Sequence, residues 1–236
     1  MRVAIRSLLI WLYVGASVLV FLPGTTLLVL LSVIDRDRWL SLHWTALFSR
    51  LNFRINPMWR LEVRGKERLG DKSKRRGPYV IVSNHQSLGD ILVVSFLPLR
   101  YRYVAKQELF SVPGFGWQLW MAGHLGVRRG DKESAARLFA RSKRVLSRGV
   151  SILYFAEGTR STTLEVGPFK SGAFQLAVAS GVAVLPVVVA GTSTALPKHS
   201  WRFTERSFCF LEILDPVDPA GHTVEALRDT VRAAIA

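Results

Sequence analysis

The sequence is poor in cysteine and in acidic residues, and both shortages limit what the protein can be. Its one cysteine, Cys209, excludes an intrachain disulfide and a cysteine-based zinc site within this chain. We expect this thiol to be a small buried side chain in the strand-like run 207–211. Acidic residues number 17 against 32 lysines and arginines, which gives a formal net charge of +15. A folded chain this basic usually meets a polyanion, such as nucleic acid, an anionic membrane or a phosphorylated substrate.

Charged residues are also missing from a long N-terminal stretch. Residues 7–34 contain none, and one straight helix of that length would reach about 42 Å, which exceeds the hydrocarbon core of about 30 Å. Pro23 and Gly24 near the middle favour a break. Basic residues flank the stretch on both sides, and basic flanks prefer the cytoplasmic side. We therefore favour a membrane-embedded helical hairpin that turns at Pro23-Gly24, with a single span as the alternative.

The next segment, residues 39–60, mixes aromatic side chains with arginines. Such a mixture is typical of the lipid headgroup layer, although an ordinary amphipathic helix on the protein's own core has the same pattern. We divide the chain into two parts, and no low-complexity linker marks a further domain. Residues 1–56 form the membrane hairpin and interfacial helix, and residues 57–236 form a separate, larger domain.

The rest of the chain alternates between apolar β-branched runs and helical patterns. The expected strands cover residues 60–64, 78–83, 101–105, 151–155, 182–190 and 207–213. The clearest helix covers 131–148, where Asp131 can cap the start and Gly149 can end it, and a last helix begins near Thr223. This alternation predicts an α/β fold, with a mixed, largely parallel sheet flanked by helices.

A polar cluster directly follows the expected strand 78–83, where α/β folds place chemistry. It contains His85 and Asp90, which would lie on different faces of a regular helix and can meet only if the chain bends between them. Ser87 supplies the bend as the N-cap of the apolar helix that follows, with Asp90 in its first turn. The carboxylate of Asp90 could then accept the ring N–H of His85 and leave the other ring nitrogen free to act as a base.

Four blocks in this order make the sequence resemble the glycerolipid acyltransferase family, and within it the bacterial 1-acylglycerol-3-phosphate acyltransferases. The first is Asn84-His85…Asp90, which is similar to the NHxxxxD block. The third is the run from Phe155 to Ser161, which resembles FPEGTRS, with Ala156 where the family usually has Pro. The second and fourth blocks are residues 106–128 and the short run 185–188. The resemblance covers roughly residues 55–215.

The resemblance implies a reaction and a set of site residues. His85, oriented by Asp90, would be the general base that deprotonates an acceptor hydroxyl as it attacks an acyl thioester. No protein nucleophile is then required, and Ser87 is better explained by its capping role. Blocks two and three would bind the phosphate-bearing acceptor, and Lys106 could also stabilise the oxyanion. The implied substrate-binding residues are Lys106, Arg128, Glu157, Gly158, Thr159 and Arg160. We read Glu157 as positioning a neighbouring arginine or an acceptor hydroxyl, and Lys170 as a further cation or a solvated lysine.

The expected activity is transfer of a fatty acyl chain from acyl-CoA or acyl carrier protein to the sn-2 hydroxyl of 1-acyl-sn-glycerol-3-phosphate. Another lysolipid acceptor and a membrane-bound thioesterase stay open as alternatives. We expect no metal, no cofactor beyond the acyl donor, and no nucleic-acid partner, because no nucleic-acid-binding motif is present. His124 and His199 are expected to be structural. An enzyme of this kind would lie on the cytoplasmic face of the inner membrane, where its basic surface meets anionic lipid.

Overall fold

The computed structural model describes residues 2–31, 38–57, 59–69, 77–161, 165–197, 200–203 and 206–236. Seven strands in these ranges form one sheet, in the order β1-β7-β6-β2-β5-β3-β4. Neighbouring strands are parallel except β6 and β7, which are antiparallel. The strands are β1 (Trp59–Arg64), β2 (Val80–Ser83), β3 (Tyr101–Lys106), β4 (Leu125–Val127), β5 (Ser151–Phe155), β6 (Val184–Ala190) and β7 (Ser207–Ile213). The predicted mixed, largely parallel sheet is therefore confirmed.

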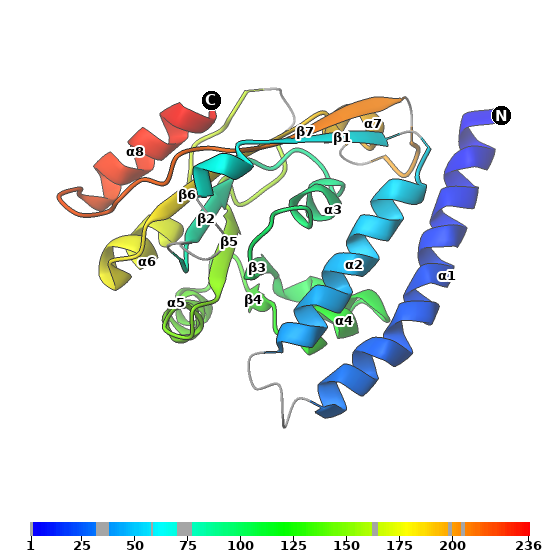
Figure 1. The fold of residues 1–236 in the computed structure, drawn as a ribbon, viewed down its shortest axis with the longest axis horizontal. Helices are drawn as coiled ribbons and strands as arrows, with labels where there is room; N and C mark the ends of the chain where they lie inside the picture. Colours follow the sequence, from blue (N-terminus) through cyan, green and yellow to red (C-terminus); the bar gives the residue numbers. More distant parts are fainter. Residues whose placement is uncertain are drawn as a thin grey trace.

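Helices cover both faces of this sheet (Figure 1). One apolar cluster joins the sheet to α5 (Lys132–Leu146), α6 (Gly172–Ser180) and α8 (Val224–Ile235). A second cluster on the opposite face includes side chains of α2 (Trp39–Ile55), α3 (Asp90–Val94) and α4 (Phe115–Met121). The short elements are η2 (Lys66–Leu69), η3 (Gln107–Ser111) and α7 (Thr192–Ala195). Strand β2 is buried along its whole length between β5 and β6, so the polar residues that follow it start from a rigid position.

The predicted helix boundaries are set by side-chain caps. Asp131 accepts a hydrogen bond from the Ser134 N–H at the start of α5, and Thr223 accepts one from the Ala226 N–H at the start of α8. Gly149, with φ 75°, follows the end of α5. The predicted starts of both helices are confirmed, and α5 ends at Leu146, two residues before the predicted end. Cys209 is fully buried in β7, as expected, and burial raises the pKa of its thiol to about 11.

The apolar N-terminal stretch does not turn at Pro23-Gly24, so that prediction is wrong. Instead α1 (Arg2–Leu30) continues through both residues, and α2 runs antiparallel beside it (Figure 1). Tertiary packing explains the glycine, because a Cβ on Gly24 would lie 2.5 Å from the Trp44 ring. The indole N–H of Trp44 also donates to the Phe21 carbonyl at 3.0 Å. Within the described residues, the N-terminal helical pair is therefore α1 with α2.

Helix α1 is the part of the described chain that could, by length and composition alone, cross a membrane, over Val3–Leu30. Its apolar side chains are largely exposed, with Leu19 at 72%. Helix α2 packs on the core of the protein through Phe48 and Phe53 and exposes Trp39 at its start. The N-terminal apolar helix is thus a candidate membrane anchor, and α2 joins it to the sheet.

Candidate active site

A buried asparagine directly follows β2, at the point where the chain leaves the sheet. The Asn84 side chain forms two hydrogen bonds with the backbone of Val189 in β6, donating to its carbonyl at 2.8 Å and accepting from its N–H at 2.9 Å. A side-chain amide thereby takes the place of the next backbone pair between β2 and β6. The following residues are free to turn away from the sheet while their starting point stays fixed.

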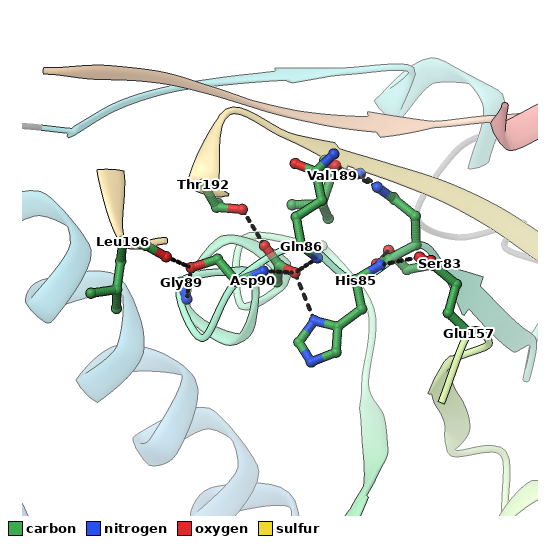
Figure 2. A network of polar contacts seen from close by, with 11 residues as sticks. Ser83, His85, Gln86, Gly89, Asp90, Glu157, Val189, Thr192 and Leu196 are labelled. Carbon is green, nitrogen blue, oxygen red and sulfur yellow. Dashed lines mark hydrogen bonds and ion pairs between the residues drawn. The ribbon is translucent and has the colours of Figure 1, made fainter. Parts of the chain in front are cut away.

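The carboxylate of Asp90 organises this turn (Figure 2). Its Oδ2 accepts hydrogen bonds from the His85 ring Nδ1 at 2.7 Å, the Gln86 N–H at 2.6 Å and the Ser87 N–H at 2.9 Å. Its Oδ1 accepts a short hydrogen bond from the Thr192 hydroxyl. Asp90 is fully buried. A buried carboxylate with these four donors holds the His85 ring in one tautomer, with the proton on Nδ1.

His85 is the member of the pair that reaches the exterior. Its side chain is 14% exposed, against 0% for Asp90. The ring stacks on Phe155 at the end of β5, with centroids 4.1 Å apart. Within the described part of the chain, the second ring nitrogen, Nε2, makes no hydrogen bond. The His85 ring therefore has a fixed orientation and one ring nitrogen open to the exterior, which is the geometry that a general base requires.

Ser87 is not the cap residue that the sequence predicts, because it lies two residues before the observed N-cap of α3. Helix α3 begins at Asp90 with Gly89 as its cap residue, so Asp90 is the first helical residue and not the third. The Ser87 hydroxyl is fully buried, accepts from the Gly89 N–H at 3.2 Å and donates to the Leu196 carbonyl at 2.8 Å. These contacts fix the loop and leave the hydroxyl without access to a substrate.

Glu157 connects the third block, the run from Phe155 to Ser161, to the backbone of His85. One carboxylate oxygen accepts from the His85 backbone N–H at 2.9 Å and the other from the Gly167 N–H at 3.1 Å. The Ser161 N–H donates to the His85 carbonyl at 2.7 Å. The observed contacts of Glu157 are thus with backbone groups, where the sequence suggested an arginine or an acceptor hydroxyl.

An open pocket of about 510 Å³ lies beside His85. Side chains of β3 form one apolar wall, and side chains of α5 and α6 form another. The predicted residues Lys106, Gly158 and Thr159 line it together with His85. Burial raises the pKa of the lining Tyr154 to about 12, so its hydroxyl stays protonated near neutral pH.

Cationic side chains line this pocket, but only some of them are the cationic residues that the sequence predicts. Lys106 lines it and lies 3.5 Å from the Glu108 carboxylate. Arg128 and Arg160 are absent from its described lining, whereas Arg129 and Lys170 belong to it. No group of three or more His, Cys, Asp or Glu side chains in the described ranges is placed to hold a metal ion.

Two residues of the site are not predicted from the sequence. Thr192 follows β6 and is 102 positions from Asp90, and only the adjacency of β6 and β2 brings them together. Arg129 lies next to Arg128, and spacing alone could not decide which of them faces the pocket. His124, expected to be structural, is buried and accepts a hydrogen bond from the Tyr103 N–H at 3.2 Å. His199 lies outside the described residues.

The departure from the family pattern at position 156 has a structural counterpart. The Ala156 N–H donates to the Ser83 carbonyl at 3.0 Å and extends the pairing of β5 with β2 beyond Phe155. The Ala156 carbonyl accepts from the Lys170 N–H at 2.7 Å. Proline has no N–H to donate, so alanine allows a hydrogen bond at this position that proline would remove.

Comparison with known proteins identifies the family of the chain. A family model described as Acyltransferase matches residues 60–190. The chain is 30% identical to the 1-acyl-sn-glycerol-3-phosphate acyltransferase of Haemophilus influenzae, over 75% of this chain and 72% of that protein. It is 33% identical to a chloroplastic 1-acyl-sn-glycerol-3-phosphate acyltransferase of Brassica napus, over 77% of this chain. The chain belongs to the acyltransferase family.

The likeness extends to the whole fold. The crystal structure of the 1-acyl-sn-glycerophosphate acyltransferase of Thermotoga maritima superposes with a TM-score of 0.83 at 27% identity, covering 99% of this chain and 93% of that one. The chain spans about half of the length of the plant and algal relatives, 52% for the Brassica protein. The shared length with the bacterial structure includes both α1 and α2.

Proposed function

We propose that the protein transfers a fatty acyl chain from acyl-CoA or acyl carrier protein to the sn-2 hydroxyl of 1-acyl-sn-glycerol-3-phosphate, which gives phosphatidic acid. The observation that carries the proposal is the His85–Asp90 pair, with the carboxylate buried and saturated and the imidazole open to a pocket. Relatives named for this reaction support the same assignment.

The chemistry requires one base and no protein nucleophile. His85 Nε2 takes the proton of the acceptor hydroxyl as the oxygen attacks the thioester carbonyl carbon, and a C–O bond forms. The tetrahedral intermediate collapses, the C–S bond breaks, and the imidazolium returns its proton to the leaving thiolate. Asp90 stabilises the transient imidazolium without accepting its proton. The buried Ser87 hydroxyl supports direct transfer without an acyl-enzyme.

The phosphate of the acceptor requires cations near the base. Lys106, Arg129 and Lys170 line the pocket, and Arg160 follows the loop that carries Gly158 and Thr159. We assign Arg160 and Arg128 to the edge of this site, where long guanidinium side chains can contact a phosphate at the pocket mouth. Glu157 contributes by holding the backbone of His85.

The location of the enzyme follows from its two parts. We assign residues 1–56 to membrane attachment and residues 57–236 to catalysis, on the cytoplasmic face of the inner membrane. A lysolipid headgroup lies at the interface and a thioester donor arrives from the aqueous side, so a domain held at the membrane surface meets both. The excess of 15 positive charges favours an anionic lipid surface.

The test is acyl transfer by the purified, detergent-solubilised protein with an acyl-CoA, an acyl carrier protein thioester and a panel of lysolipids, for wild type and His85→Ala. We expect phosphatidic acid from lysophosphatidic acid, lowered about 100-fold or more in the variant. Acylation of a different lysolipid only would refute the acceptor. Release of free fatty acid without transfer would instead identify a thioesterase.

A further inference from the structure

Helix α4 exposes tryptophans where a helix that faces water would expose charged side chains. Trp117 is 53% and Trp120 is 63% exposed, and Val112 just before the helix is exposed as well. The two tryptophans are three positions apart, so they lie on the same side of α4. Residues 109–127 contain no Asp, Glu, Lys or Arg. An exposed apolar surface of this kind marks a contact with a partner or a membrane.

This surface continues onto α1, which lies beside α4 (Figure 1). An apolar groove of about 430 Å³ lies between the two helices and is lined by Leu22, Thr26, Phe110, Trp117, Trp120 and Met121. The Thr26 hydroxyl lies 3.8 Å from the Met121 sulfur. Leu19 and Leu30 are exposed, and they lie one helical turn from Leu22 and Thr26. The exposed side of α1 and the tryptophans of α4 therefore form the two banks of one apolar groove.

Three features favour a lipid bilayer as the occupant of this surface. The groove is continuous with α1, the candidate membrane anchor. Tryptophan is typical of the membrane–water interface, because its ring is apolar and its indole N–H is polar. The Arg38 guanidinium lies over the Trp120 ring at 5.5 Å, and a cation beside an aromatic ring suits the headgroup layer. Acyl chains would fill the groove and remove its apolar walls from water.

We propose that Trp117 and Trp120 form a second membrane contact, on the catalytic domain itself. Together with the exposed side of α1, they lie in the headgroup layer and the outer part of the acyl-chain layer. This inference rests on the proposed attachment of residues 1–56 to the membrane, and it extends the membrane surface of the protein beyond them.

The second contact lies next to the proposed active site. Helix η3 separates the groove from the pocket of His85, because Leu109 lines the pocket and the adjacent Phe110 lines the groove. A bilayer that meets α4 therefore also meets the outer side of η3. The lipid surface is then adjacent to the pocket that takes the lysolipid.

The test uses a nitroxide spin label on a single introduced cysteine, in the full chain reconstituted into phosphatidylcholine vesicles. Trp117→Cys and Trp120→Cys report the second contact, and Leu19→Cys reports the anchor. Phe208→Cys is the matched control, because Phe208 has the same exposed fraction as Trp117. Its neighbour Cys209 packs in the cluster of α2, α3 and α4, so Phe208 points to the opposite face of the sheet. Cys209 is fully buried, and the wild-type chain should take up no label.

The measurement compares collisions of the label with oxygen, which dissolves among acyl chains, and with a polar nickel chelate, which stays in water. We expect an oxygen-to-nickel collision ratio about 10-fold higher at Trp117, Trp120 and Leu19 than in the control, because a polar chelate is excluded from an apolar layer. Acyl transfer plays no part in this measurement, so the result is independent of the proposed reaction.

Three outcomes would decide against the second contact. A ratio at both tryptophan positions equal to that of the control, with a high ratio at Leu19, would refute it and leave the anchor in place. A low ratio at Leu19 as well would refute the anchor and the second contact together. Spin–spin broadening at Trp117 that disappears on dilution with unlabelled protein would show that a second copy of the chain covers the tryptophans.

Discussion

Replacing Asp90 by Asn removes one charge from the site and changes little else. The amide oxygen can stay where Oδ2 now accepts from the His85 ring and from the Gln86 and Ser87 N–H groups. The amide nitrogen then replaces Oδ1 and faces Thr192, whose hydroxyl can reverse from donor to acceptor. We therefore expect Asp90→Asn to fold with the loop and the tautomer of His85 preserved.

We expect Asp90→Asn to lose part of the stabilisation of the transition state. The charge of Asp90 matters most when His85 becomes an imidazolium, and a hydrogen bond between charged groups is worth about 1.5–3 kcal/mol. That free energy corresponds to a fall of about 10- to 100-fold in kcat. Substrate affinity should change little, because the neutral His85 of the ground state keeps its hydrogen bond. The KM values of donor and acceptor should then stay near those of wild type.

The assay is steady-state acyl transfer in detergent, with thermal unfolding measured on the same samples. Thr192→Val is the matched control, since it removes a donor to the other carboxylate oxygen and keeps the charge. We expect its loss of kcat to be smaller than that of Asp90→Asn. A folded Asp90→Asn enzyme with wild-type kcat would refute the role given to the carboxylate. Equal losses in both variants would mean that loop geometry, and not charge, governs the rate.

Four further changes test other parts of the molecule. Arg160→Ala should raise the acceptor KM with a smaller effect on kcat, because a phosphate contact acts in both ground and transition states; steady-state kinetics would measure it, and an unchanged KM would remove this residue from the site. Glu157→Gln leaves a backbone N–H facing an amide donor and should lower the free energy of unfolding by about 1–3 kcal/mol, which denaturant titration would detect. Gly24→Leu should lower the melting temperature by separating α1 from α2, whereas Gly15→Leu, with open space around it, should not. Burial lowers the pKa of His124 to about 3, so wild type should lose about 2 kcal/mol of stability between pH 7 and pH 5 as the unfolded histidine gains its proton; His124→Asn should flatten that dependence.

The sequence predicts the sheet well because its strands are buried and apolar. The run through Val184–Ala190 pairs on both sides and has the continuous hydrophobicity of such a strand. Strand β4, with three residues, is too short to show a period, and it is not among the strands expected from the sequence. The order of strands, including the antiparallel pair β6 and β7, depends on contacts that no local pattern contains.

The site is predictable where its residues are close in the chain and not elsewhere. His85 and Asp90 lie within one loop, so turn chemistry alone indicates that they meet. Thr192 reaches the same carboxylate through the fold. The N-terminal error has a similar origin: Pro23-Gly24 is a strong local signal for a break, and the packing of Gly24 on Trp44 overrides it.

The loop around Asp90 makes the folding of the site and its chemistry inseparable. The backbone N–H groups of residues 86 and 87 and the ring of His85 all converge on one oxygen, so the anion acts as the centre on which the loop closes. One residue inserted between His85 and Asp90 would leave this ring unable to close. Loss of this accepting oxygen, as in Asp90→Ala, would release the base and the loop together. The spacing of the pair is therefore a constraint on chain length as much as on catalysis.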